Sequence, residues 1–134
     1  HTFVLSCIDS RVPPEIVFDQ GIGNLFVARV AGNIEDPNIL GSMEYAVQVK
    51  GTKLLVVLGH SNCGAVQGAI DNVNLGHLTQ LTNQIKVAFS HHRTYPLPEH
   101  LSNEAGRLNV LSTIDHILSS SQIIRELVNK KKSK

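Results

Sequence analysis

The sequence contains no tryptophan, only two cysteines in 134 residues, and few aromatic side chains (4%). Two cysteines are too few for the disulfide framework of a small secreted protein. The scarcity of aromatic rings argues against a stacking platform for single-stranded nucleic acid. No apolar run reaches the roughly 18 residues of a membrane-spanning helix, so we expect no membrane insertion. With 42% hydrophobic residues, the chain is instead typical of a packed globular domain.

The sequence also lacks a broad excess of positive charge. Its formal net charge is +1, from 12 basic and 11 acidic residues. Four of the basic residues are lysines within 130–134, so the rest of the chain carries 8 against 11, or −3. We interpret this tail as a solvated end and expect no nucleic-acid partner. No signal peptide is visible, and the expected location is cytoplasmic.

Strand and helix patterns alternate in the first half of the chain. Apolar, β-branched runs predict strands, apolar residues at helical spacing predict helices, and the second half reads as helical throughout. The predicted strands are 2–8, 25–30 and 53–58, and the predicted helices are 14–18, 37–50, 62–72, 75–92, 103–118 and 121–130. This alternation predicts an α/β fold, with a parallel β-sheet core flanked by helices in a single domain over 1–134.

Residues suited to chemistry follow two of the predicted strands. Cys7, Asp9 and Arg11 come after the first strand, and His60 and Cys63 come after the third. Ligands gather at the carboxyl ends of parallel strands, and neighbouring strands lie about 5 Å apart, so the two loops can share one site. Two thiolates and one imidazole favour zinc, and three protein ligands leave one position open, as in catalytic zinc sites.

Each of these residues also has an ordinary structural interpretation. A cysteine in a buried strand is usually a small core residue, and an Asp–Arg pair two residues apart is often a surface ion pair. A redox role for Cys7 and Cys63 as a dithiol is a further alternative, although no Cys-x-x-Cys motif supports it. Only the joint occurrence of these residues at two strand ends favours a metal site.

The joint pattern resembles the β-class carbonic anhydrases. The Cys-x-Asp-x-Arg element, combined with a distant His-x-x-Cys after a second apolar strand, is highly specific. The matching segments are Cys7-Ile8-Asp9-Ser10-Arg11-Val12-Pro13, residues 25–33, Glu44-Tyr45-Ala46 and Gly59-His60-Ser61-Asn62-Cys63-Gly64. The similarity is dense over residues 3–70 and faint again over 109–128.

The resemblance implies a zinc enzyme that hydrates carbon dioxide reversibly to bicarbonate and a proton. By motif position Cys7, His60 and Cys63 would bind Zn²⁺, and a water would fill the fourth position. Asp9 would accept a hydrogen bond from that water, and Arg11 would hold Asp9 in place.

The resemblance also implies a substrate pocket and a partner subunit. The positions of Phe26, Ala31, Tyr45 and Gly64 match residues that line the family's narrow pocket. Because the family's pockets lie at subunit interfaces, we expect a homodimer or a higher homo-oligomer. Alternatives on the same scaffold are a hydrolase of carbonyl sulfide or carbon disulfide, and a family member that binds zinc but is inactive.

Two elements of the family pattern have no counterpart here. The family has a glutamine shortly before its first cysteine, and a final strand after its last matching helix. The sequence therefore predicts a β-carbonic anhydrase-like domain that is truncated at both ends. Some members bind bicarbonate at an inhibitory site containing a tryptophan; Val4 occupies that position, so we expect no such site, although Arg29 matches its basic member.

Overall fold

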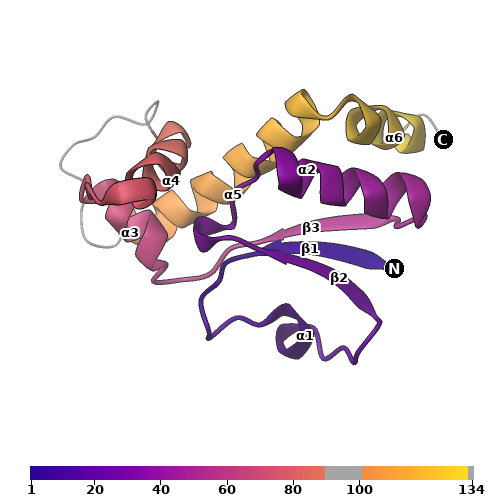
Figure 1. Ribbon diagram of the computed structural model, residues 1–134, viewed down its shortest axis with the longest axis horizontal. Coiled ribbons are helices and arrows are strands. Elements are labelled where there is room, and N and C mark those ends of the chain that lie inside the picture. Colours follow the sequence, from indigo (N-terminus) through magenta and orange to yellow (C-terminus); the bar gives the residue numbers. More distant parts are fainter. Residues whose placement is uncertain (90–100, 133–134) are drawn as a thin grey trace.

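Three parallel strands form the sheet in residues 1–89 and 101–132, the part of the chain that the computed structural model describes. The central strand is β1 (Thr2–Ser6), which pairs with β2 (Leu25–Arg29) on one side and with β3 (Leu54–Leu58) on the other (Figure 1). The order is therefore β2-β1-β3. All three carboxyl ends reach the same edge of the sheet, as the sequence predicts.

Helices connect and follow the strands. Their bounds are α1 (Pro14–Val17), η1 (Ala31–Asn33), α2 (Pro37–Glu44), η2 (Tyr45–Val49), α3 (Gly64–Ile70), α4 (Gly76–Val87), α5 (Leu101–Ser120) and α6 (Gln122–Lys132). The predicted α/β class is confirmed, with strands and helices alternating in the first half. Among the described helices, none combines the length and the hydropathy needed to cross a bilayer.

The start of α2 follows from local chemistry. Asp36 is its N-cap, and the carboxylate accepts a hydrogen bond of 2.8 Å from the backbone N–H of Ile39. Pro37 occupies the first helical position, where the missing N–H is not needed. The helix therefore begins at the residue where the sequence predicts it, Pro37.

One face of the sheet packs against α2, α5 and α6 (Figure 1). The core between these layers is apolar because the inward side chains of β1 meet the apolar stripes of the helices. Its buried members are Phe3, Leu5, Met43, Ala46, Ile117 and Ile124.

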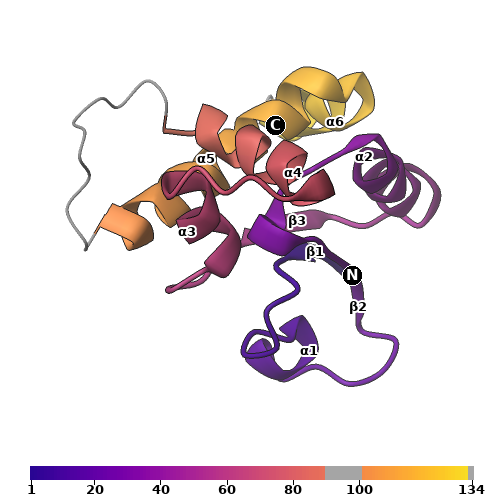
Figure 2. The ribbon, with the colours of Figure 1, turned by 60° about the vertical axis from the view of Figure 1, so that its left-hand side comes forward.

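A second core cluster lies beyond the carboxyl ends of the strands. There α3 and α4 lie side by side and α5 packs against α3 (Figure 2). The buried members are Cys7, Ile34, Cys63, Val66, Ala69, Ile85, Phe89 and Ala105. Both cysteines therefore belong to a well-packed part of the molecule, which fixes the backbone from which their sulfurs project.

The opposite face of the sheet is covered only in part, by the short helix α1 (Figure 1). Several large apolar side chains of this region are exposed: Ile16, Val17, Phe18, Ile22 and Leu54. Ile16 is 77% exposed and Ile22 is fully exposed. Exposed apolar residues gathered in this way are typical of a surface that another protein surface covers.

The helix predicted over 37–50 differs from the observed one in its second half. The α-helix ends at Glu44 and continues as the π-helix η2, in which the N–H of Lys50 donates to the carbonyl of Tyr45. Hydrophobic spacing over a single turn does not distinguish bonds to the fourth residue from bonds to the fifth, so the sequence did not reveal this change. For the helix predicted over 75–92, residues 90–92 lie outside the described part.

Candidate metal centre

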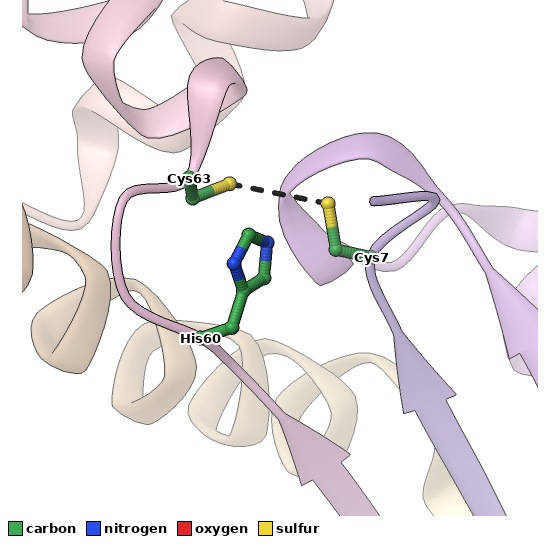
Figure 3. Close-up of side chains that lie close together, drawn as sticks. All are labelled: Cys7, His60 and Cys63. Carbon is green, nitrogen blue, oxygen red and sulfur yellow. Dashed lines mark hydrogen bonds between the residues drawn. The ribbon is translucent and has the colours of Figure 1, made fainter. Parts of the chain in front are cut away.

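Cys7, His60 and Cys63 converge at the carboxyl edge of the sheet. Cys7 follows β1 directly, whereas His60 and Cys63 lie between β3 and α3. Because β1 and β3 are neighbours, the two loops emerge side by side, and the three side chains point toward one another (Figure 3). Their potential ligand atoms all lie within 4.8 Å of one another. No other group of three His, Cys, Asp or Glu residues in the described ranges is as close.

The histidine is oriented for a metal. His60 Nδ1 lies 2.8 Å from the carbonyl oxygen of Ser61, to which it can donate a hydrogen bond. This assignment places the proton on Nδ1 and leaves the lone pair on Nε2. His60 Nε2 is buried and has no hydrogen-bond partner. A buried nitrogen of this kind costs free energy unless something binds it, and together with two thiols it fits zinc.

The two thiols interact directly with each other. Cys7 Sγ and Cys63 Sγ are 3.9 Å apart, and both residues are buried. The hydrogen bond from Cys63 is the main cause that lowers the pKa of Cys7, and the backbone N–H of Gly32 lowers it further. The pKa of Cys63 is raised, because its proton is shared with Cys7 and because the residue is buried. Both thiols must lose their protons to bind a metal, and a bound cation would favour that loss.

Asp9 and Arg11 form a tight pair beside the metal group. Arg11 Nε donates to Asp9 Oδ1 at 2.9 Å, and one terminal guanidinium nitrogen donates to Oδ2 at 2.6 Å. The backbone N–H of Arg11 also donates to Oδ1. These bonds hold the pKa of the Asp9 carboxyl well below its usual range. Asp9 Oδ2 lies 3.9 Å from His60 Nε2, so a carboxylate oxygen stands next to the group of ligands.

Arg11 and Arg29 tie together the backbone segments that carry these residues. Arg11 donates to the carbonyl oxygen of Asn62 at 3.0 Å, which links the two loops. Arg29, at the end of β2, donates to the carbonyl oxygens of Cys7 at 2.8 Å and of Asp9 at 2.6 Å. Sequence reasoning considered Arg29 only as one part of an anion site. The sequence gives no sign that Arg29 hydrogen-bonds to the backbone of the Cys7–Asp9 segment, because no local pattern of residues indicates such a long-range bond.

Gly32 contacts the sulfur of Cys7 through its backbone. Its backbone N–H donates to Cys7 Sγ at 3.3 Å, and its φ of +75° lies in the left-handed region that favours glycine. A Cβ built on Gly32 would lie 2.5 Å from Ile85 Cδ1 and 3.4 Å from Ala65 Cβ. The conformation favours a glycine here, and any Cβ would force the end of the Ile85 side chain to move.

Replacing Gly32 with alanine should lower the free energy of unfolding by about 2–3 kcal/mol, from the left-handed conformation and the steric overlap together. Gly51 is a matched control, because its φ is +71° and its Cβ would meet nothing within 4 Å. Gly51→Ala should cost only about 1 kcal/mol, from the left-handed conformation alone. Urea unfolding of both variants measures the difference, and equal losses would mean that the contact with Ile85 relaxes without strain.

The predicted pocket residues do not all lie at the metal group. Gly64 directly follows Cys63, and Ala31 directly precedes Gly32, whose backbone N–H contacts Cys7 Sγ. A Cβ at Gly64 would meet no atom within 4 Å, so the space beside this glycine is open.

Phe26 and Tyr45 lie elsewhere. They line a cleft of about 500 Å³ together with Phe3 and residues of α2. Phe26 is the partner of Phe3 in the sheet, and Phe3 precedes Cys7 by four residues, which is about 13 Å along a strand. These two side chains therefore belong to the amino end of the sheet, opposite the metal group of the same chain.

The fold and this residue group can be compared with known proteins. The family model described as carbonic anhydrase matches residues 2–134. The chain belongs to the β-carbonic anhydrase family. Carbonic anhydrase 2 of Mycobacterium tuberculosis is 53% identical over 75 residues, which are 56% of this chain and 36% of that protein. The match thus spans about a third of the relative's length.

Solved structures of β-carbonic anhydrases share the fold. A tetrameric enzyme of the ascomycete Sordaria macrospora superimposes with a TM-score of 0.86 at 27% identity, covering 98% of this chain and 70% of that one. The apo form of a carbon disulfide hydrolase superimposes with a TM-score of 0.58 at 18% identity, covering 91% of this chain and 66% of that one. The second likeness concerns the fold alone.

Proposed function

We propose that this β-carbonic anhydrase family member binds Zn²⁺ and catalyses the reversible hydration of carbon dioxide. The observation that carries the proposal is the group of Cys7, His60 and Cys63, with the Asp9–Arg11 pair beside it. Cys7 Sγ, Cys63 Sγ and His60 Nε2 would hold the metal. When bound, zinc supplies Lewis acidity, which lowers the pKa of water to about 7 and provides a nucleophile at neutral pH.

In this proposal Asp9 positions the nucleophile. Its carboxylate is ionised near neutral pH, and the hydrogen bonds from Arg11 hold its pKa still further below that range. Oδ1 already accepts hydrogen bonds from Arg11 Nε and from the Arg11 backbone N–H, whereas Oδ2 accepts one from the guanidinium and keeps a lone pair that can accept a hydrogen bond from an attacking water. Fixing the direction of that O–H turns the oxygen lone pair toward the substrate carbon, which is a contribution from orientation. Arg11 acts through Asp9, and its contact with Asn62 fixes where the pair stands.

Carbon dioxide is small, linear and apolar, so its binding site needs an apolar surface and no ionic anchor. Gly64 directly follows Cys63, and Ala31 precedes Gly32, which contacts Cys7, so these two are the candidates for lining this chain's own pocket. We propose that Phe26 and Tyr45 complete the pocket of a neighbouring subunit in a homodimer or larger homo-oligomer. The proposal is supported by their cleft at the far end of the sheet and by the exposed apolar side chains around α1.

This division between subunits predicts complementation. Tyr45→Ala keeps its own metal ligands, and Cys63→Ser keeps its own Tyr45, so each variant alone should be inactive or strongly impaired. In a mixed dimer one of the two sites combines intact Cys63 with intact Tyr45. Equal mixing should therefore restore about a quarter of wild-type hydration, because half of the dimers are mixed and each has one complete site. A mixture no more active than its components would contradict the shared pocket.

Zinc titration and stopped-flow hydration of carbon dioxide test the function directly. One zinc per chain together with hydration supports the proposal, and failure to bind zinc overturns it. Bound zinc without hydration would favour the inactive family member. The rates with carbonyl sulfide and carbon disulfide, relative to the rate with carbon dioxide, test the alternative of a hydrolase for those sulfur compounds. A disulfide between Cys7 and Cys63 that forms reversibly and controls activity would favour the redox role.

A further inference from the structure

Asn109 is a polar side chain in an apolar position. It lies in the middle of α5 and is only 2% exposed. Its amide nitrogen donates a hydrogen bond of 2.7 Å to the carbonyl oxygen of Gly32, a residue 77 positions earlier in the sequence. Buried amides are kept where a specific partner needs them, since an unpaired one is costly. The partner here belongs to the segment that contacts Cys7.

Gly32 is therefore held on both sides. Its carbonyl accepts from Asn109 Nδ2, and its N–H donates to Cys7 Sγ at 3.3 Å. The next residue, Asn33, has a φ of +46°. Two consecutive left-handed residues form a backbone that a chain rarely adopts unless its surroundings fix it. The hydrogen bond from Asn109 on α5 is one of the contacts that hold this backbone.

An N–H that points at a thiolate draws charge from the sulfur. A ligating sulfur with such a bond is a weaker donor, and partners of this kind orient metal ligands and tune the metal. If the Asn109 bond is lost, the buried Gly32 carbonyl has no partner, and the η1 backbone relaxes away from its left-handed conformation. The N–H of Gly32 then moves off Cys7 Sγ.

We infer that Asn109 is a positioning residue of the metal centre: it holds Gly32 so that the Gly32 N–H remains bonded to the Cys7 sulfur. The inference rests on the proposed zinc function. Asn109 lies too deep in the packing between α5 and η1 to be assigned any direct contact with substrate, and it acts through Gly32 alone. Its effect is therefore on the thiolate and the metal.

Asn109→Leu and Asn109→Asp test the inference, with Thr113→Val as the control. Thr113 is also 2% exposed, on the same helix one turn further along. Zinc affinity is measured by competition with a chelator, and the sulfur-to-metal charge-transfer band is recorded after cobalt substitution. Both Asn109 variants should bind zinc about tenfold more weakly, because the Cys7 sulfur is no longer held in one orientation, and this loss outweighs the gain in donor strength. Because the sulfur without its N–H bond is the stronger donor, their band should move to longer wavelength. Thr113→Val should lose stability but keep the wild-type affinity and band.

A measurement on the wild-type protein covers the case in which the Asn109 variants do not fold. In protein loaded with cadmium-113, the amide of Gly32 should show scalar coupling to the metal through the N–H···S hydrogen bond. Absence of that coupling would overturn the inference, as would Asn109 variants that lose stability while zinc affinity and band stay unchanged. If the wild-type chain binds no metal, the proposed function has failed first, which is a distinguishable result.

Discussion

Replacing Cys63 with serine is expected to remove zinc binding and, with it, hydration of carbon dioxide. A serine hydroxyl remains protonated near neutral pH and is a poor ligand for zinc, so only Cys7 and His60 would remain. The loss of zinc affinity should exceed the roughly 10–100-fold loss that follows removal of a residue that only hydrogen-bonds to a metal ligand. Chelator competition measures the affinity, and metal analysis of the purified variant measures the content.

Stability provides a second readout for Cys63→Ser. Zinc that binds the folded wild type should raise its free energy of unfolding by about 2.7 kcal/mol at a free concentration of 100 times Kd. The variant should show no such dependence. Ser61→Ala is the matched control, because Ser61 lies in the same loop and its interaction with His60 uses only the backbone carbonyl. A Cys63→Ser protein that remains zinc-replete would refute the ligand assignment.

The sequence could predict that the three metal ligands lie close together, because their proximity depends only on which residues follow the parallel strands. Cys7 and His60 each follow an apolar strand, and parallel strands bring such loops to one edge whatever the details of the helices. The Asp9–Arg11 pair is likewise local, two residues apart in one turn, and the structure contains it as expected. Predictions that rest on strand ends and on residues close in sequence remain correct when the predicted element boundaries are wrong by one or two residues.

What surrounds the site could not be predicted in the same way. The bonds from Asn109 to Gly32 and from Arg29 to Cys7 join residues 77 and 22 positions apart. Their formation depends on how α5 and β2 pack, which hydrophobic spacing does not specify. The opposite placement of Phe26 and Tyr45 is a similar case: family resemblance indicates that residues share a pocket, but it does not say which residues come from the same chain.

Asp9→Asn should separate catalysis from metal binding. The asparagine has nearly the same shape, so zinc affinity should stay within a few-fold of wild type. Its amide nitrogen cannot accept a hydrogen bond, however, and the pair with Arg11 is broken on one side. Loss of a positioned acceptor at a reacting group reduces rates by about 100-fold or more. Stopped-flow hydration measures the loss, and Asp36→Asn, which retains an N-cap on α2, is the matched control.

The pH profile sharpens the test. Arg11 lowers the pKa of Asp9, first by its side-chain hydrogen bonds and then by its backbone N–H. A carboxyl whose pKa is lowered is ionised at every pH above its usual range near 4, so between pH 6 and 9 the rate of the wild type should show no step from Asp9. Asp9→Asn should therefore lower hydration by the same factor across this range. A loss confined to one end of it would mean that Asp9 titrates during turnover.

Arg11→Met then tests whether Arg11 acts only through Asp9. Removing the guanidinium removes its hydrogen bonds to Asp9 and the contact with Asn62, so hydration should fall while zinc remains bound. The double variant Asp9→Asn/Arg11→Met should be no slower than Asp9→Asn alone, because both changes disable one positioning unit. If the rate losses of the two single variants multiply in the double variant, Arg11 contributes separately from Asp9. If Asp9→Asn loses zinc, the role of Asp9 is in metal binding and not in orienting the nucleophile.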